Sequence, residues 1–310
     1  MKIVFLDAKT IGKDVSLESF RELGEFVTYE TSSKGQILNH IGDAQVVLTN
    51  KVVIDSETMD ACPQLRLICI TATGMNNVDL NYAKKKGIVV KNAAGYSTAS
   101  VTQTTFTLAL YLIAQTKFYD GFVSSGEWSK SGLFTNVERP FSEIKGKKWG
   151  IIGFGNIGKS VAKVADAFGA DVSYFSTSGV NNHNSYRRIQ LDEMLQACDI
   201  ISIHAPLNEK TSGLIKKEQL DLMKKGAILL NLGRGGIIDE ADLAYAIDNN
   251  EILAGLDVTA TEPIQINNPL LHVKKKEKLI ITPHIAWASY EARVELMRIV
   301  ANNIKEFMKN

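Results

Sequence analysis

The feature that most constrains the fold of this chain is an alternation of short apolar runs with amphipathic stretches along nearly all of its 310 residues. The apolar runs are KIVFLD, EFVTY, AQVVLTN, LRLICI and IVVKN in the first hundred residues. Between them, DVSLESFRELG, GQILNHIGD, DSETMDACPQ and DLNYAKKKG have the pattern of helices. Strands that alternate with helices are typical of a parallel sheet with helical crossovers, so the sequence predicts an α/β fold.

The alternation is interrupted once and then restarts near residue 146. Residues 97–121 form an uninterrupted helical pattern, in which Ser100 and Gln103 have the spacing of a capping box. Residues 117–145 are a long, aromatic-bearing connection without clear periodicity, and loops of this length are usually functional or interfacial. From KKWGIIGFG onward strands and helices alternate again, and residues 289–310 form one amphipathic helix. We therefore expect two α/β units.

Composition excludes several classes of function. A formal net charge of +1 gives no electrostatic reason to expect nucleic acid or a membrane as a partner. The longest apolar run, TFTLALYLIA, has about half the length of a membrane-spanning helix, and the N-terminus lacks a signal-peptide pattern. Cys62, Cys69 and Cys198 form neither a CxxC pair nor a disulfide framework. We expect a cytoplasmic protein with reduced thiols and no metal site.

The motif GFGNIG directly follows the predicted strand WGII and opens an amphipathic helix. Gly153 allows the tight turn, Gly155 lets the backbone approach a pyrophosphate, and Gly158 lets the helix pack on the strand. The helix beginning near Asn156 and Ile157 offers free N–H groups to phosphates. This context predicts a nicotinamide cofactor, NAD(H) or NADP(H).

About 20 residues later, where an Asp or Glu normally binds the adenosine ribose, the sequence has the hydroxyls of Ser176, Thr177 and Ser178. Without a carboxylate, nothing there repels the 2′-phosphate of NADP, and hydroxyls can donate to phosphate oxygens. His183, Arg187 and Arg188 would add positive charge if their loop folds back. The interpretation leans modestly to NADP(H) or dual use. The alternative is NAD bound through backbone contacts.

Three further segments each follow a predicted strand and supply Arg234, Glu262 and His284. Residues just past parallel strands converge on the ligand crevice of such a sheet. An arginine can hold a carboxylate and polarise the adjacent carbonyl. A histidine can donate a proton to a developing alkoxide, and a carboxylate behind it fixes its tautomer. Together these groups suit the reduction of a 2-oxoacid, although each residue alone has an ordinary structural explanation.

The chain resembles the D-isomer-specific 2-hydroxyacid dehydrogenase family over essentially its whole length. The segments that carry the resemblance are, in family order, TATGMNNVD, NAAGYSTASV, GIIGFGNIG, SIHAPL, NLGRGGIIDE, GLDVTATEP and TPHIAW. The resemblance implies two doubly wound parallel-sheet domains, with a Rossmann cofactor domain inserted in a flavodoxin-like substrate domain. The expected boundaries are 1–98 plus 283–310 for the substrate domain and 99–282 for the cofactor domain, with the active site in the cleft between them.

The resemblance also assigns roles to residues. It makes Arg234 the substrate-binding arginine, His284 the acid/base and Glu262 its partner. Thr73 and Gly74 match the loop whose backbone N–H groups hold the substrate carboxylate, and Asp257 matches the residue that orients the nicotinamide carboxamide. The segment after Gln115 resembles the arm through which family members form homodimers. Thr104 is a departure, because members of the SVAQHT type have a histidine at this place in the linking helix.

The stretches WSKSGLF and HIAWAS resemble the glycerate dehydrogenase and hydroxypyruvate reductase branch. They favour D-glycerate/hydroxypyruvate, or glyoxylate, as the substrate. Trp287 is expected to line the cleft unless it is a core residue, and Lys51 is expected to reach the substrate unless it is a solvated surface lysine. Two alternatives stay open: a dehydrogenase for another 2-hydroxy acid such as D-lactate, and a nucleotide-sensing corepressor-like protein that is not an enzyme.

Overall fold

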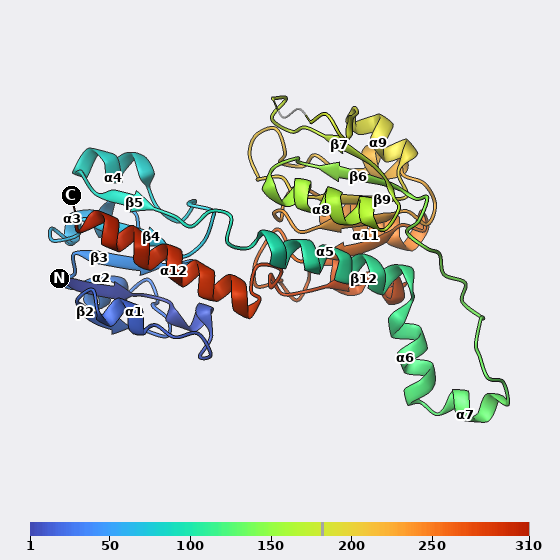
Figure 1. Ribbon diagram of the computed structural model, residues 1–310, viewed down its shortest axis with the longest axis horizontal. Helices are drawn as coiled ribbons and strands as arrows, with labels where there is room; N and C mark the ends of the chain where they lie inside the picture. Colours follow the sequence, from blue (N-terminus) through green and yellow to red (C-terminus); the bar gives the residue numbers. More distant parts are fainter. Residues whose placement is uncertain (181–182, 310) are drawn as a thin grey trace. The chain divides into compact units, whose positions relative to one another are not determined.

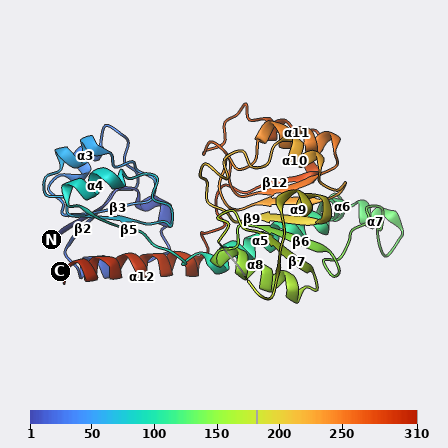
Figure 2. The ribbon, with the colours of Figure 1, turned by 90° about the horizontal axis from the view of Figure 1, so that it is seen from above.

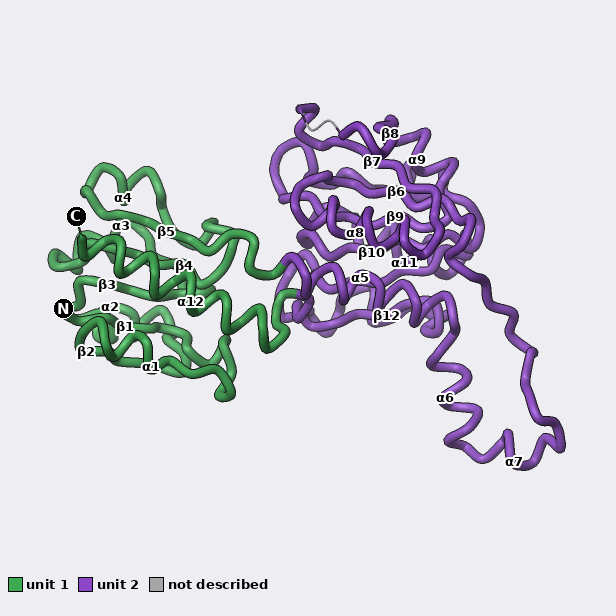
Figure 3. Tube along the Cα trace, viewed as in Figure 1, with its two compact units in different colours: residues 1–97, 287–310 green, residues 98–286 purple. Residues whose placement is uncertain are grey.

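The computed structural model describes residues 1–180 and 183–309, and these divide into two compact units (Figure 3). Unit 1 comprises residues 1–97 and 287–310, and unit 2 comprises residues 98–286. The chain therefore leaves unit 1 once and returns to it, which is the inserted arrangement that the resemblance implies. The return falls four residues later than the expected boundary at 282/283, so His284 lies in unit 2.

Unit 1 is built on a five-stranded parallel sheet with the order β2-β1-β3-β4-β5. This is the strand order of flavodoxin-like folds. It confirms the predicted fold class. The strands are β1 (Lys2–Phe5), β2 (Glu25–Thr28), β3 (Val46–Thr49), β4 (Leu67–Ile70) and β5 (Val89–Lys91).

Helices cover both faces of this sheet because successive strand residues point to opposite sides. Ile3 and Phe5 pack in one cluster with Phe20 and with the apolar side of the C-terminal helix. Val4 and Leu6 pack in the other cluster. The first face carries the 3₁₀ turn η1 (Ala8–Ile11), α1 (Glu18–Arg21) and α12 (Tyr290–Phe307); the second carries α2 (Ile37–Ile41), α3 (Ser56–Ala61) and α4 (Leu80–Lys86). The sequentially distant helix α12 runs along the sheet in Figure 1.

Unit 2 is built on a seven-stranded sheet with the order β12-β11-β10-β9-β6-β7-β8, in which every pair is parallel. The chain starts in the middle at β6, proceeds to β8, and then crosses back to continue on the other side. That reversal is the Rossmann arrangement and creates a topological switch point beside β6. The strands are β6 (Lys148–Ile152), β7 (Asp171–Phe175), β8 (Arg187–Arg188), β9 (Ile200–Ile203), β10 (Ile228–Asn231), β11 (Leu253–Leu256) and β12 (Leu279–Ile281).

The two faces of the unit 2 sheet carry different helices (Figure 2). One face is covered by α5 (Thr98–Ile113) and α8 (Asn156–Ala167). The other is covered by α9 (Leu191–Ala197), α10 (Lys217–Asp221) and α11 (Glu240–Asn249), whose apolar side chains share one core cluster with the strands. The short turns η2 (Pro269–His272) and η3 (Lys276–Lys278) precede β12. No helix within residues 1–180 and 183–309 combines the length and apolarity needed to span a bilayer.

Three expectations about residues 97–145 were wrong. The helix is interrupted, because α5 ends at Ile113 and Gln115 adopts a left-handed backbone with φ of 50° before α6 (Thr116–Ser124) begins. Ser100 is not a cap but lies inside α5, where its hydroxyl donates to the Ala286 carbonyl at 2.6 Å. The connection also contains α6 and α7 (Glu127–Ser131). Neither helix has a buried residue, and both project from unit 2 (Figure 1).

Candidate active site

The predicted cofactor and catalytic residues of unit 2 lie just past the carboxyl ends of its strands. Gly153 follows β6, Ser176 follows β7, Arg234 follows β10, Asp257 follows β11 and His284 follows β12. Since all strands are parallel, these ends share one edge of the sheet, the edge at which doubly wound folds bind ligands.

The glycine turn is shaped by close backbone packing at two of its three glycines. Gly153 has φ of 91°, and a Cβ there would lie 2.8 Å from the His204 carbonyl carbon. A Cβ on Gly158 would lie 2.2 Å from the Gly153 carbonyl oxygen. A side chain at either position would force the turn away from its neighbours, so these two glycines are required by the fold.

Gly155 has a different role, because a Cβ there would meet nothing within 4 Å. The space in front of it is free, and Gly155 is also the N-cap of α8, without a side-chain hydrogen bond to the first helical turn. Asn156 is exposed and Ile157 half-buried at that helix start. An open backbone surface at a helix N-terminus is the donor set that a pyrophosphate requires. The residues present therefore fit a dinucleotide.

The hydroxyl segment after β7 forms a tight turn. The Gly179 N–H donates to the Ser176 carbonyl at 3.2 Å, and the Ser176 and Ser178 hydroxyls lie 3.5 Å apart. Ser176 is buried, Thr177 half-buried and Ser178 exposed. The turn therefore presents hydroxyl groups where a cofactor-binding acid is otherwise expected.

His284 and Glu262 are brought together from different strand ends. The Glu262 Oε2 atom lies 2.6 Å from Nδ1 of His284, and Oε1 accepts from the Thr259 N–H at 3.2 Å. A carboxylate on Nδ1 holds the proton on that nitrogen, which leaves Nε2 as the atom able to exchange a proton with a ligand. Both side chains are partly accessible, at 24% for His284 and 32% for Glu262. The pairing predicted from the sequence is present.

Asp257 supports the backbone around His284. Its carboxylate accepts from the Thr282 hydroxyl at 2.6 Å and from the N–H groups of Ile285 at 2.9 Å and Ala286 at 2.8 Å. His284 itself has a left-handed backbone with φ of 54°, which costs free energy unless the surroundings hold it. Burial raises the pKa of Asp257, although these three donors act in the opposite direction. Asp257 therefore positions the histidine loop in addition to the cofactor role that the resemblance implies.

Arg234 lies in a turn that only glycines allow. A Cβ on Gly235 would lie 1.9 Å from the Thr259 carbonyl oxygen, and a Cβ on Gly233 would lie 2.8 Å from the Ala205 carbonyl oxygen. The turn is thus packed between the ends of β9 and β11. Arg234 is half-buried, and one of its terminal nitrogens donates to the Gly233 carbonyl at 2.8 Å. Its remaining N–H groups are suited to a planar carboxylate.

Thr73, Gly74 and Lys51 lie past strand ends of unit 1. The Thr73 hydroxyl donates to the Ala93 carbonyl at 3.0 Å, and the Lys51 side chain is exposed. Within residues 1–180 and 183–309, neither Thr73 nor Gly74 shows a hydrogen-bond acceptor for its backbone N–H. Free amides in a strand-end loop are suited to an anionic ligand.

Asp7 is a positioning residue that sequence reasoning missed. It is buried at the end of β1, and its carboxylate accepts from the N–H groups of Asn50, Lys51 and Val52. Burial raises the pKa of Asp7, against the effect of those backbone donors. The loop that carries Lys51 is therefore fixed by a buried carboxylate. The signal in the sequence was an aspartate directly after the apolar run KIVFL.

Trp287 packs against the core of unit 1. It is half-buried and meets Tyr96 edge to face, with ring centroids 6.3 Å apart. Part of its surface stays accessible, so the predicted contact with substrate remains a prediction.

His204, in the segment SIHAPL, was not singled out either. The residue keeps some exposed surface, yet both ring nitrogens are inaccessible and have no partner within the described part of the chain. Burial lowers the pKa of His204 to about 3. A histidine that is neutral at physiological pH is unsuited to the proton transfer assigned to His284.

Comparison with known proteins agrees with this geometry. Residues 106–286 match the family model described as D-isomer specific 2-hydroxyacid dehydrogenase, NAD binding domain. A hydroxypyruvate reductase of Blautia hydrogenotrophica is 40% identical, over 100% of this chain and 97% of that protein. A glycerate dehydrogenase of Methylorubrum extorquens is 36% identical, over 99% and 96%.

Among solved structures, an acyclic imino acid reductase in complex with NADPH and D-Arg superposes with a TM-score of 0.84 at 28% identity, covering 100% of this chain and 97% of that one. The agreement of fold, strand-end residues and whole-length sequence similarity leads to one conclusion. This chain belongs to the D-isomer-specific 2-hydroxyacid dehydrogenase family.

Proposed function

We propose that this protein is a nicotinamide-dependent oxidoreductase that interconverts D-glycerate and hydroxypyruvate, or reduces glyoxylate. The observation that carries the proposal is the His284–Glu262 pair at 2.6 Å, on the same sheet edge as a glycine turn fit for a dinucleotide. The names of the relatives at 40% and 36% identity support this substrate class.

A nicotinamide cofactor held at the turn of Gly153, Gly155 and Gly158 would supply or accept the hydride. His284 donates the proton from Nε2 to the oxygen of the oxoacid during reduction and takes it back during oxidation. Glu262 stabilises the imidazolium and keeps the tautomer fixed. Arg234 binds the substrate carboxylate and polarises the adjacent carbonyl.

The residues of unit 1 complete the proposal. The free amides of Thr73 and Gly74 bind the substrate carboxylate, Lys51 adds a cation, and Trp287 excludes water from the reacting atoms.

For the cofactor we propose a preference for NADP(H), or use of both nucleotides, because Ser176 replaces the usual acid. The complex of a structural relative with NADPH supports this proposal.

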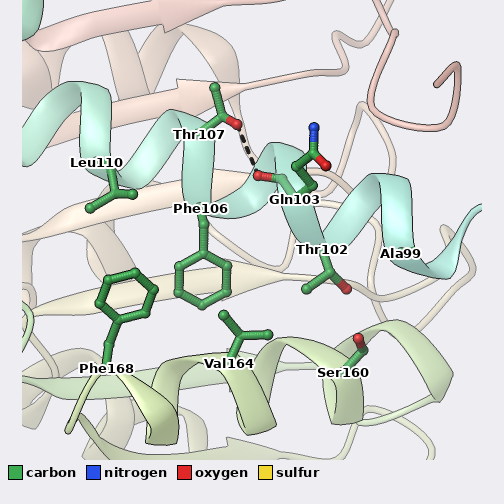
Figure 4. A pocket seen from close by; sticks show the side chains of 9 residues that line it. All are labelled: Ala99, Thr102, Gln103, Phe106, Thr107, Leu110, Ser160, Val164 and Phe168. Atoms are coloured by element: carbon green, nitrogen blue, oxygen red, sulfur yellow. Dashed lines mark hydrogen bonds between the residues drawn. The ribbon is translucent and has the colours of Figure 1, made fainter.

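We further propose that the protein is a homodimer formed through the arm, residues 116–145. The arm exposes Leu133, Val137, Phe141 and above all Phe134, which is 91% accessible. Unit 2 also has an apolar groove of about 480 Å³ between α5 and α8 (Figure 4). Phe106, Val164 and Phe168 point into this groove. Exposed apolar patches of this kind usually mark an interface, and a second copy supplies matching arms and grooves.

Light scattering after gel filtration tests the dimer. Phe134→Asp should shift the protein toward the monomer. Ile266→Asp serves as control, since Ile266 is 87% accessible but lies outside the arm. A wild-type monomer at micromolar concentration would contradict the proposal.

We also propose a cytoplasmic location, which suits three buried free thiols, of which Cys69 has its pKa raised to about 12 by burial.

The enzymatic proposal is tested by the oxidation of NADPH and NADH with hydroxypyruvate, glyoxylate or pyruvate as acceptor. His284→Ala should lower kcat by roughly 10²- to 10⁴-fold, the usual contribution of a positioned acid/base. His272→Ala should leave kcat unchanged, because His272 is exposed in the turn η2, before β12, with its Nε2 atom 3.2 Å from the Ile266 carbonyl oxygen. Nucleotide binding without turnover of any oxoacid would overturn the proposal and favour a nucleotide-sensing protein. Preference for pyruvate would favour D-lactate.

A further inference from the structure

We propose that Arg188 is the residue that selects the cofactor, by binding the 2′-phosphate of NADP(H) together with the hydroxyl turn 176–179. The inference rests on the proposed function and names the specificity-determining residue of its cofactor site. In the sequence, Arg188 lies beside Arg187 and close to His183, and all three are equivalent sources of positive charge there.

The register of β7 and β8 separates the two arginines. Tyr174 pairs with Arg188 and Ser173 pairs with Arg187 in a parallel ladder. Paired residues in a sheet point to the same face, and so do residues two apart along one strand. The Arg188 side chain therefore lies on the face of Tyr174, whereas Arg187 lies on the opposite face, that of Ser173.

Contacts of the two side chains agree with this register. One terminal nitrogen of Arg188 donates to the Gly179 carbonyl at 2.9 Å, so its guanidinium lies against the hydroxyl turn. A guanidinium has five N–H donors in a fixed fork, and most remain for a phosphate. No carboxylate of residues 1–180 or 183–309 lies within ion-pair distance of Arg188. Arg187, in contrast, forms an ion pair with Glu193 at 2.8 Å.

The strand that carries Arg188 is fixed relative to the phosphate-binding turn by aromatic packing. Phe154, the second residue of GFGNIG, stacks on Tyr174 with ring centroids 4.0 Å apart. His183 and Tyr186 meet the same phenylalanine edge to face, at 5.5 and 6.0 Å. The segment leading into β8 is thus packed on the glycine turn itself. The Arg188 guanidinium therefore has a defined position relative to the glycine turn that would hold the pyrophosphate.

The chemistry of the turn suits a phosphate and not a ribose diol. A carboxylate would accept from the 2′-hydroxyl and repel a 2′-phosphate. The turn instead offers hydroxyl donors beside a guanidinium that has no carboxylate partner in the described part of the chain, the combination that binds phosphate oxygens through charge-assisted hydrogen bonds. Binding of a 2′-phosphate would explain why Ser176 stands where a carboxylate is otherwise expected.

Isothermal titration calorimetry of the full chain tests this, with adenosine 2′,5′-bisphosphate and 5′-AMP as probes. The wild type should bind the bisphosphate at least 10-fold more tightly. Arg188→Ala should remove most of that advantage, a loss of about 10- to 100-fold for a charge-assisted pair, and leave the affinity for 5′-AMP unchanged. Arg187→Ala is the matched control: it removes the same charge one residue away and should keep the advantage.

The outcomes separate this inference from the proposed function. If Arg188→Ala and Arg187→Ala lose the same part of the affinity advantage for the bisphosphate, the effect is a general one of charge and the role of Arg188 is overturned. An unchanged advantage in Arg188→Ala would overturn that role as well. Equal affinity of the wild type for both probes would overturn the inference and leave the dehydrogenase intact with NAD. Absence of binding of either probe would instead contradict the nucleotide site on which the proposed function depends.

Discussion

Asp257→Asn should destabilise unit 2 through the loop that carries His284. The wild-type carboxylate accepts three hydrogen bonds: from Thr282 and Ile285 on one oxygen and from Ala286 on the other. The amide keeps one acceptor oxygen, so its NH₂ group must face one of the three donors. Asp257 is 1% accessible, which leaves no water to replace the lost partner.

The expected magnitude follows from that count. One hydrogen bond to a charged acceptor is lost, and one buried N–H is left unsatisfied, so the free energy of unfolding should fall by about 2–3 kcal/mol. Urea unfolding at pH 7, followed by far-UV circular dichroism, measures this as a lower midpoint with an unchanged slope.

A matched control is available on the same unit. Asp248 also accepts from two backbone N–H groups, those of Lys274 and Lys275, but at a half-buried site that water can reach. Asp248→Asn should cost under about 1 kcal/mol, because water can take over the lost bond. Equal stabilities of the two variants would refute the argument that burial, and not the number of bonds, sets the cost.

The remaining predictions concern other parts of the site. Glu262→Gln should lower the kcat of reduction, since the amide can turn its NH₂ group toward Nδ1 of His284 and no longer fixes the tautomer; an unchanged kcat would exclude that pairing. Gly235→Ala should destabilise by about 3 kcal/mol or more, because its Cβ would lie 1.9 Å from the Thr259 carbonyl oxygen. Gly155→Ala should unfold as the wild type does but bind nucleotide more weakly in calorimetry, because the added methyl enters open space. Burial lowers the pKa of His204 to about 3, so the unfolded chain binds a proton below about pH 6.5 that the folded chain does not bind. The free energy of unfolding should therefore fall between about pH 6.5 and 3, by at most about 1.4 kcal/mol per pH unit. Urea titrations of His204→Leu should lack this slope.

Much of the architecture could be predicted from the sequence because it depends on local periodicity. Apolar runs buried on both faces, separated by amphipathic stretches, permit little besides parallel sheets with helical crossovers. The glycine turn GFGNIG could likewise be predicted, because the strand before it and the helix after it are both recognisable in the sequence. The interruption at Gln115 was missed, because α6 keeps a helical pattern although it buries no residue. Hydrophobic periodicity predicts that residues form a helix, but not the direction in which the chain continues after that helix.

The sequence by itself determined which chemical groups follow the strands of this protein. The tertiary structure decided which of those groups meet. Glu262 and His284 are 22 residues apart and lie at 2.6 Å only because β11 and β12 are neighbours. Arg187 and Arg188 are equivalent in composition, yet strand register sends one to Glu193 and the other to the hydroxyl turn. Side-chain direction in a sheet has a period of two residues, so adjacent residues of the same type acquire opposite surroundings, which become visible only once the strand has found its partner.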